Sequence, residues 1–175
     1  KFIQYLENVL RKEEFMSMEE KQNSQTSLDF NQNIFKPTSR EEIVEIVKTC
    51  YRKNIPLEIN GLKSKNKIGR NFQSEKTLDL SDYKGIIDYK PEELYIKVKA
   101  GTPLKEIIQE LDKNNQQLAF EPNDFGYLFS GESNSGSIGG VVSCNFAGSR
   151  RFKVGSVRDH ILGFQGINGK GETIK

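Results

Sequence analysis

The chain has 175 residues, enough for one ordinary domain or for two small subdomains that share a ligand. Its net charge of +2, with lysines scattered along the chain, is too small to indicate binding to nucleic acid or to a membrane surface. The two cysteines form no CxxC pair, the single histidine argues against a histidine-rich metal site, and neither a transmembrane run nor a signal-peptide pattern is present. We therefore expect a cytoplasmic protein.

The chain starts at Lys1 and stops at Lys175 within a strand-like run, so we expect a fragment trimmed at one or both ends. Apolar residues at spacings of three and four predict a helix over residues 1–20. A helix that packs on its own domain is favoured over one that docks on a partner. Residues 21–33 are rich in Gln, Asn and Ser and resemble a linker. Residues 1–34 are therefore predicted to precede the compact domain.

A helix follows at the start of the compact domain. Thr38 or Ser39 can cap it, and a glutamate three residues further on can complete a capping box. We expect the buried face to comprise Ile43, Val44, Ile46 and Val47. The helix should end before Pro56, and residues 57–59 are predicted to form a strand.

The segment after this strand, residues 60–66, carries a glycine, a hydroxyl, amides and two lysines. Backbone N–H groups in such a turn can converge on an anion. Neither the P-loop pattern nor the GxGxxG pattern of dinucleotide-binding folds is present. Taken alone, the segment is better interpreted as a solvated hairpin loop.

Short strands are predicted at residues 78–80 and 86–89, with a turn at 91–93 and an alternating, half-buried strand over 94–100. A second helix should begin at Thr102 as the cap, with Pro103 in the first helical position. Its expected core residues are Leu104, Ile107, Ile108 and Leu111.

Three further segments complete the chain apart from its glycine-rich part. Residues 117–120 are predicted to form a strand, and residues 121–136 a long loop whose apolar members (Phe125, Tyr127, Leu128 and Phe129) cover another part of the protein. Residues 160–167 should form a strand that turns back at 168–171.

Ten of the fifteen glycines lie between Gly131 and Gly171, around the segment 137–159. Glycines within regular elements cost stability, so this segment requires bare backbone. Two interpretations stay open on glycine content alone: a surface that wraps a large phosphate-bearing ligand, and a set of tight turns between short strands.

Other reactive residues in this part of the chain have ordinary explanations. His160 is better interpreted as structural than as catalytic, and Cys144 as a small packing residue. Arg150 and Arg151 are equally compatible with a solvated surface and with an anion or partner site, and Arg158 can also hold an anion.

The order of several motifs resembles the FAD-binding domain of the vanillyl-alcohol-oxidase and p-cresol-methylhydroxylase superfamily. These motifs are Leu-Asp-Leu-Ser at 78–81, Val-Lys-Ala-Gly-Thr-Pro-Leu at 98–104, Ser-Ile-Gly-Gly-Val-Val-Ser at 137–143, Asn-Phe-Ala-Gly at 145–148 and Gly-Ser-Val-Arg-Asp-His-Ile-Leu-Gly at 155–163. The run Gly-Ser-Arg-Arg at 148–151, followed by the last of these motifs, is similar to the FAD-binding subunits of bacterial glycolate oxidases.

The resemblance implies an α+β fold of two subdomains over residues 35–175. The first would span 35–120 and the second 121–175, truncated at its C-terminal end. FAD would lie between the two subdomains.

The resemblance also implies which residues bind FAD. The first loop, Asn60, Gly61, Leu62, Lys63, Ser64 and Lys65, would bind the diphosphate. Ser137, Ile138, Gly139, Gly140, Ser143, Asn145 and Gly148 would line the ribityl, diphosphate and flavin side. Gly155, Ser156, Val157 and Ile161 would line the rest, including the adenine side. A diphosphate needs several N–H donors at close range, and a helix beginning at 138–140 suits its charge.

Two departures from the family are visible. Many relatives attach flavin to a histidine in the first loop, and here that loop has none, so FAD is expected to bind noncovalently. Residues 127–135 resemble an insertion of unknown effect.

The implied function is that of an FAD-binding subunit in a 2-hydroxyacid (glycolate) oxidase or dehydrogenase complex. Its partners would be a sibling flavin subunit, which oxidises the substrate, and an iron–sulfur subunit. The chain itself offers no plausible catalytic base or metal site. The alternative is a non-catalytic structural module that has lost its flavin.

Overall fold

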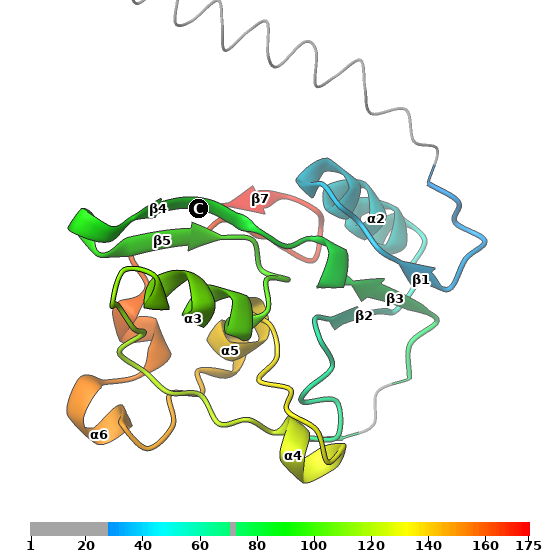
Figure 1. Ribbon diagram of the computed structural model, residues 1–175. Helices are drawn as coiled ribbons and strands as arrows, with labels where there is room; N and C mark the ends of the chain where they lie inside the picture. The colour runs from blue at the N-terminus through cyan, green and yellow to red at the C-terminus, as the bar shows by residue number, and fades with distance from the viewer. Residues whose placement is uncertain (1–27, 71–72) are drawn as a thin grey trace, which may run out of the picture. The chain divides into compact units, whose positions relative to one another are not determined.

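The structure is a computed structural model that describes residues 28–70 and 73–175. Contacts divide the chain into two compact units, Lys1–Asn31 and Gln32–Lys175. The helix predicted over residues 1–20 lies outside the described residues. The second unit mixes helices with short strands, which confirms the predicted fold class to that extent (Figure 1). Its division into two subdomains stays a prediction.

A three-stranded parallel sheet forms the first part of this unit. Its strands are β1 (Ile34–Phe35), β3 (Lys76–Asp79) and β2 (Leu57–Asn60), in that spatial order. The 3₁₀ helix η1 (Leu80–Asp82) follows β3. Because β2 and β3 are parallel, the segment between them crosses over, and the interpretation of residues 60–66 as a hairpin loop is wrong.

Helix α2 (Arg40–Arg52) has the predicted N-terminal cap. The Ser39 hydroxyl accepts a hydrogen bond from Glu42 N at 3.2 Å, and Thr38 N donates to Glu42 Oε2 at 2.8 Å. The buried face is turned slightly from the predicted one, and comprises Ile43, Ile46 and Cys50. Val44 and Val47 are only partly buried. Burial raises the pKa of the Cys50 thiol, with Lys76 and Lys53 opposing the shift.

An antiparallel hairpin follows, made of β4 (Ile86–Lys90), the 3₁₀ helix η2 (Pro91–Glu93) and β5 (Tyr95–Val98). Leu94 is the first residue of the strand predicted over 94–100, but it has left-handed backbone (φ 57°) and is 79% exposed. The reason is that the turn extends one residue further than the apolar alternation indicates. Gln116 ties the hairpin to the end of the next helix, accepting from Tyr89 Oη at 2.6 Å and donating to Pro91 O at 2.8 Å.

Helix α3 (Leu104–Asp112) begins one residue later than predicted, with Pro103 at the cap position. The fully buried Thr102 does not cap it. Instead, the Thr102 hydroxyl accepts from Gly85 N at 2.9 Å and donates to Lys99 O at 2.7 Å. The helix buries Leu104, Ile107 and Leu111, whereas Ile108 is 42% exposed.

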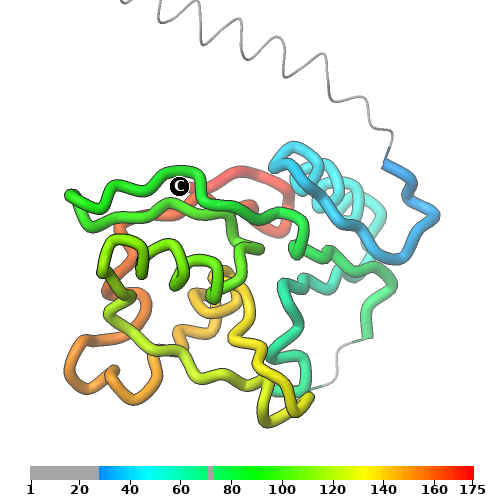
Figure 2. The backbone as a smooth tube through the Cα atoms, viewed as in Figure 1, coloured from blue at the N-terminus to red at the C-terminus, as the bar shows by residue number. Residues whose placement is uncertain are grey.

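The C-terminal part contains mostly short helices, which Figure 2 shows as successive turns of the tube. They are α4 (Gly126–Phe129), α5 (Ile138–Cys144), α6 (Arg151–Val154) and the 3₁₀ helix η3 (Val157–His160). A core cluster joins α5 and η3 to α3, and consists of Leu104, Phe120, Val141, Ala147 and Val157.

Two strand predictions in this region are wrong. Residues 117–120 form no strand, and of 160–167 only β6 (Gly166–Ile167) pairs, with β7 (Thr173–Ile174). Short apolar runs are ambiguous because a buried irregular segment has the same composition as a strand. The turn at 168–171 is confirmed, with Gly171 N donating to Asn168 O at 2.9 Å.

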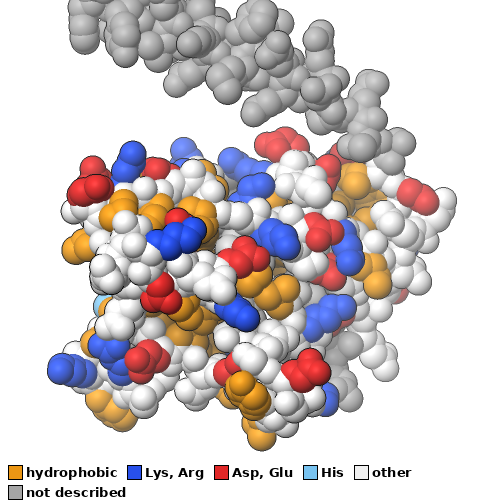
Figure 3. Space-filling view, viewed as in Figure 1, with side chains coloured by type: hydrophobic (Ala, Val, Ile, Leu, Met, Phe, Trp, Pro, Cys, Tyr) orange, Lys and Arg blue, Asp and Glu red, His pale blue; other side chains and the backbone are white. Residues whose placement is uncertain are grey.

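The surface carries both signs of charge. On the face drawn in Figure 3, lysine and arginine side chains alternate with acidic ones. Within residues 28–70 and 73–175, no helix is both long enough and apolar enough to cross a membrane.

Candidate functional site

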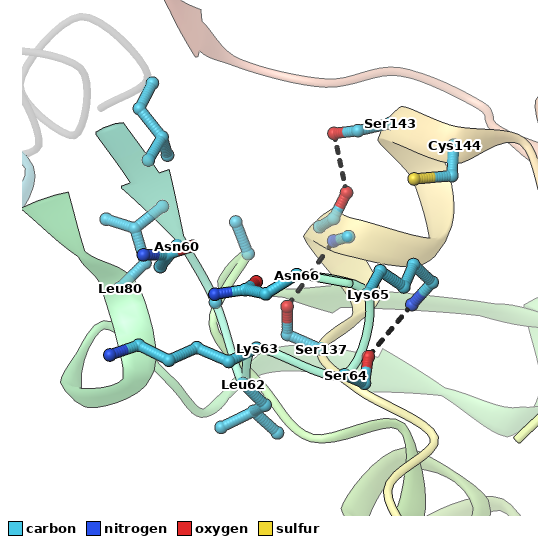
Figure 4. A pocket seen from close by; sticks show the side chains of 15 residues that line it. Asn60, Leu62, Lys63, Ser64, Lys65, Asn66, Leu80, Ser137, Ser143 and Cys144 are labelled. Atoms are coloured by element: carbon cyan, nitrogen blue, oxygen red, sulfur yellow. Dashed lines mark hydrogen bonds between the residues drawn. The ribbon is translucent and has the colours of Figure 1, made fainter. Parts of the chain in front are cut away.

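A pocket of about 310 Å³ lies between the segment after β2 and helix α5 (Figure 4). It brings together two segments that are far apart in sequence and that were both predicted to bind FAD. The predicted residues that line it are Asn60, Gly61, Leu62, Lys63, Ser64, Lys65, Ser137, Gly139, Gly140 and Ser143.

The α5 wall of the pocket has its first backbone donors already paired. Ile138 N donates to Thr102 O and Gly139 N to Ala100 O, both at 2.9 Å. Gly140 N lies 3.4 Å from the hydroxyl of the cap residue Ser137, which accepts from it. The helix begins where the sequence predicted, but a ligand at this wall meets few unpaired N–H groups.

The loop wall is different, because its backbone donors are unpaired. The N–H groups of residues 62–65 donate no hydrogen bond to any described residue. Lys63 adopts left-handed backbone (φ 56°) within this turn. Consecutive N–H groups in a turn that includes a left-handed residue can form an anion-binding concavity.

The two lysines of this loop, Lys63 and Lys65, lie in different environments, and Figure 4 shows their side chains extending in opposite directions. Lys65 Nζ donates to Ser64 Oγ at 3.2 Å, beside α5. Burial lowers the pKa of Lys65, while the neighbouring Cys144 and Asp124 oppose that shift. A bound anion would therefore meet a partly desolvated ammonium group, whose attraction is stronger than that of a fully hydrated one.

Lys63 lies on the side of Asp79, the last residue of β3. Burial by itself would raise the pKa of Asp79. Hydrogen bonds from Ser81, including Ser81 N at 3.0 Å, and the charges of Lys63 and Lys36 outweigh burial, so the pKa is lowered. The ionised Asp79 therefore offsets part of the positive charge on this side of the pocket.

Three glycines at the pocket differ in what a side chain would meet. A Cβ atom at Gly61 would collide with Ser137 Oγ, and one at Gly139 would lie 2.8 Å from Ala100 O. A Cβ atom at Gly140 would lie 3.5 Å from Ser137 Oγ and 3.9 Å from Lys65 Nζ, which is ordinary contact. Gly61 and Gly139 therefore allow the backbone to pack, whereas the bare surface of Gly140 leaves space that belongs to the pocket.

The remaining predicted site residues do not line this pocket: Ile138, Asn145, Gly148, Gly155, Ser156, Val157 and Ile161. Asn145 ends α5 in left-handed conformation, and its Oδ1 accepts from Arg158 N at 3.2 Å. Val157 is fully buried in the core. Ile138 and Ile161 pack against the same core cluster. The assignment of these residues to FAD stays a prediction.

Five lining residues were not among the predicted site residues: Ile59, Asn66, Leu80, Ala100 and Cys144. Leu80 follows β3 and reaches the pocket because Asp79 pairs in register with Asn60 at the end of β2. The sequence analysis predicted no pairing between these two strands. A predicted parallel pairing would have indicated that Leu80 lies next to the loop after β2. Cys144 was interpreted as a packing residue, but it is exposed.

The other reactive side chains make local contacts. His160 Nε2 lies 2.8 Å from Val154 O, and its ring lies 5.8 Å from that of Phe120, which fits the structural interpretation. Arg150 forms an ion pair with Glu121 at 3.2 Å. In the described part of the chain, no group of three or more His, Cys, Asp or Glu side chains could hold a metal ion.

Several known proteins are similar to this chain. Glycolate oxidase subunit GlcE of Escherichia coli (strain K12) is 36% identical over 135 residues, which cover 77% of this chain and 36% of that protein. D-lactate dehydrogenase of Anaerostipes hadrus is 28% identical over 79% of this chain and 27% of its own length. The chain thus spans about a third or less of the length of these relatives.

Solved structures share the fold at low sequence identity. Alkyldihydroxyacetonephosphate synthase aligns with a TM-score of 0.63 at 18% identity, over 81% of this chain and 28% of that one. Phl p 4.0202, a glucose dehydrogenase, aligns with a TM-score of 0.66 at 15% identity, with the same coverage of 81% and 28%. The family described as FAD binding domain matches residues 32–175, and the chain belongs to that family.

Proposed function

We propose that the pocket binds the diphosphate of FAD and that the chain is the flavin-binding part of a glycolate oxidase-type 2-hydroxyacid dehydrogenase. The observation that carries the proposal is the run of unpaired N–H groups at residues 62–65, beside the space left open at Gly140. A diphosphate requires several donors at close range. The unpaired donors and the open surface at Gly140 together support a phosphate-bearing ligand.

The chemistry of the pocket suits part of FAD. The Lys65 ammonium group and the Ser64 hydroxyl add a charge and a hydrogen-bonding group to the backbone donors. The pocket volume, about 310 Å³, is at the lower end of the range of roughly 300–1,000 Å³ for small-molecule sites. The pocket therefore suits the diphosphate and its immediate neighbours, and the rest of FAD would contact other surfaces.

FAD would be held noncovalently, because no histidine lies in the first loop. When bound, FAD supplies the redox chemistry, as hydride acceptor and electron relay. The residues of this chain bind and orient it, and we assign none of them a catalytic role. The similarity to GlcE, which is named as a glycolate oxidase subunit, supports an assembly with other subunits. That these are a sibling flavin subunit and an iron–sulfur subunit is what the resemblance to the family implies.

The absorption spectrum of the purified full-length protein tests the proposal. We expect flavin bands, and we expect acid precipitation to release them into the supernatant, because the attachment is noncovalent. Flavin that stays with the precipitate would refute noncovalent binding. A colourless protein that takes up no added FAD would refute the function itself, and would favour a structural module that has lost its flavin.

A further inference from the structure

Residues 124–136, which we call the clasp, form a loop whose two ends are linked by hydrogen bonds to the carboxylate of Asp124. Asp124 Oδ1 accepts hydrogen bonds from Gly126 N at 2.8 Å and from Asn134 N at 2.9 Å. Asp124 Oδ2 accepts from the hydroxyls of Ser133 at 2.7 Å and Ser135 at 3.5 Å. An ionised carboxylate offers about four acceptor positions. Asp124 therefore uses its accepting capacity within the clasp.

The clasp contacts the loop that follows β2 through its middle and through its C-terminal end. Asn134 Nδ2 donates to Leu62 O at 3.0 Å, and Lys67 Nζ donates to Phe129 O at 2.8 Å. Gly136 lies so close to Ser64 that a Cβ atom on the glycine would collide with the serine hydroxyl. Figure 2 shows the two segments side by side, as these bonds require. The clasp thus contacts the residues that present the unpaired N–H groups.

Close packing and hydrogen bonds inside the clasp restrict its backbone conformation. A Cβ atom at the buried Gly126 would collide with Asn134 N and Glu132 O. Asn134 Oδ1 also accepts from Gly136 N at 3.1 Å, so this one side chain links the clasp to Leu62 and to its own end. At its start, the Phe125 ring lies 5.2 Å from that of Phe146, just after α5. The clasp therefore contacts both the loop wall and the segment that follows α5.

We infer that Asp124 is a positioning residue of the pocket, which acts through Asn134 and Gly136 to hold residues 62–65 in an anion-binding conformation. The ligand it serves, FAD, rests on the proposed function, but the positioning itself does not. Burial alone would raise the pKa of Asp124, and its hydrogen bonds outweigh burial and lower it, which agrees with a carboxylate that works in its ionised form.

Amide hydrogen exchange tests the positioning without any ligand. Ile68 N donates to Lys65 O at 2.9 Å and reports on the loop wall, whereas Lys99 N, which donates to Gly85 O at 3.0 Å, reports on the β4–β5 hairpin. In Asp124→Ala we expect exchange at Ile68 to accelerate about tenfold, the loss expected when hydrogen bonds to a charged acceptor are removed. Exchange at Lys99 should stay unchanged.

Glu132→Gln is the matched control, because it removes one negative charge from the same segment. No hydrogen bond or ion pair of the Glu132 carboxylate to a described residue is present. We expect wild-type exchange at both reporters in this variant. Wild-type exchange at Ile68 in a folded Asp124→Ala protein would overturn the inference, as would equal acceleration in Glu132→Gln.

Asn134→Ala removes the hydrogen bond to Leu62 O. If Asp124→Ala does not fold, this variant tests whether the clasp positions residues 62–65. It should accelerate exchange at Ile68 as well, and the double variant should add little, because residues that act through one another are not additive. Unchanged exchange at Ile68 in Asn134→Ala overturns the inference.

Binding of FAD and of riboflavin, which lacks phosphate, separates this inference from the proposed function. In Asn134→Ala we expect affinity for FAD to fall about tenfold while affinity for riboflavin changes little. Equal losses for both ligands would mean that the clasp does not act on the diphosphate site. A wild-type protein that binds no FAD refutes the proposed function, and the exchange experiment still decides the role of Asp124.

Discussion

The two halves of the glycine-rich segment, residues 137–144 and 145–159, use bare backbone for different purposes. In the first half, Gly139 allows α5 to pack against Ala100, and Gly140 leaves space in the pocket. The second half lines no part of that pocket and makes turns, as at Gly148, whose backbone has φ 70°. Turns and a ligand surface require the same residue type, so glycine density alone could not separate them. The turn interpretation is confirmed for the second half, whereas a ligand surface in the first half stays a prediction.

The largest expected effect is on the fold, in the second half. Gly148→Ala would place a Cβ atom against Glu121 O in a backbone conformation that alanine rarely adopts. We expect a loss of about 3 kcal/mol in the free energy of unfolding, measured by urea denaturation. Gly169→Ala is the control, since no atom lies within 4 Å of its Cβ position and its φ is not positive. A Gly148→Ala protein as stable as wild type would show that this turn does not require glycine.

The second effect is on binding, in the first half. Gly140→Leu fills the space between Ser137 Oγ and Lys65 Nζ, so we expect affinity for FAD to fall about 100-fold, the effect of overpacking a close contact. The stability of the ligand-free protein should be unchanged or should rise by about 0.5–1 kcal/mol, because leucine favours a helix more than glycine does. Titration calorimetry and urea denaturation measure the two quantities.

Gly169→Leu makes the same substitution away from the pocket, and it should bind FAD as the wild type does. Wild-type affinity in Gly140→Leu would place the diphosphate elsewhere. If binding and stability fell together, Gly140 would serve the fold, and the contrast between the two halves would be lost.

Local patterns in the sequence were sufficient for part of the fold. The cap at Ser39, the β4–β5 hairpin and the turn at 168–171 depend on residues a few positions apart, and all three were predicted. Thr102 was misassigned because its hydroxyl accepts from Gly85 N, far from the helix it precedes. In the wrong strand at 117–120, Leu118 and Phe120 pack against the core without pairing, whereas in 160–167 Leu162 and Phe164 are exposed.

The pocket was predictable where a family motif covers it and not elsewhere. The loop after β2 and the start of α5 were both identified by resemblance, and the structure brings them together. Leu80 lines the pocket because β2 and β3 pair in parallel, and Ala100 because its carbonyl accepts a hydrogen bond from Gly139 N of α5. Neither contact has a local signal in the sequence. Asp124 likewise accepts from residues up to 11 positions away, in a segment that resembled an insertion.

The smallest expected effect is a pH dependence that belongs to the second half alone, because residues 137–144 contain no carboxylate. Asp159 Oδ2 accepts from Ser156 N at 2.7 Å and from Ser156 Oγ at 2.8 Å. The backbone bond and then the hydroxyl bond lower the pKa of Asp159, and burial opposes them only in part. The folded protein therefore binds this proton more weakly than the unfolded chain, in which an aspartate has a pKa of about 3.9.

The contribution of Asp159 to stability is thus complete above that value and disappears as the pH falls through the lower pKa of the folded protein. We expect Asp159→Asn to be slightly less stable than wild type at pH 7, by less than Gly148→Ala, and the unfolding free energies of Asp159→Asn and wild type to converge as the pH is lowered below about 4. Glu92→Gln, at an exposed residue of η2, should keep the wild-type pH dependence. A constant difference between Asp159→Asn and wild type across this range would mean that the amide loses packing rather than charge, and acid sensitivity would no longer distinguish the two halves.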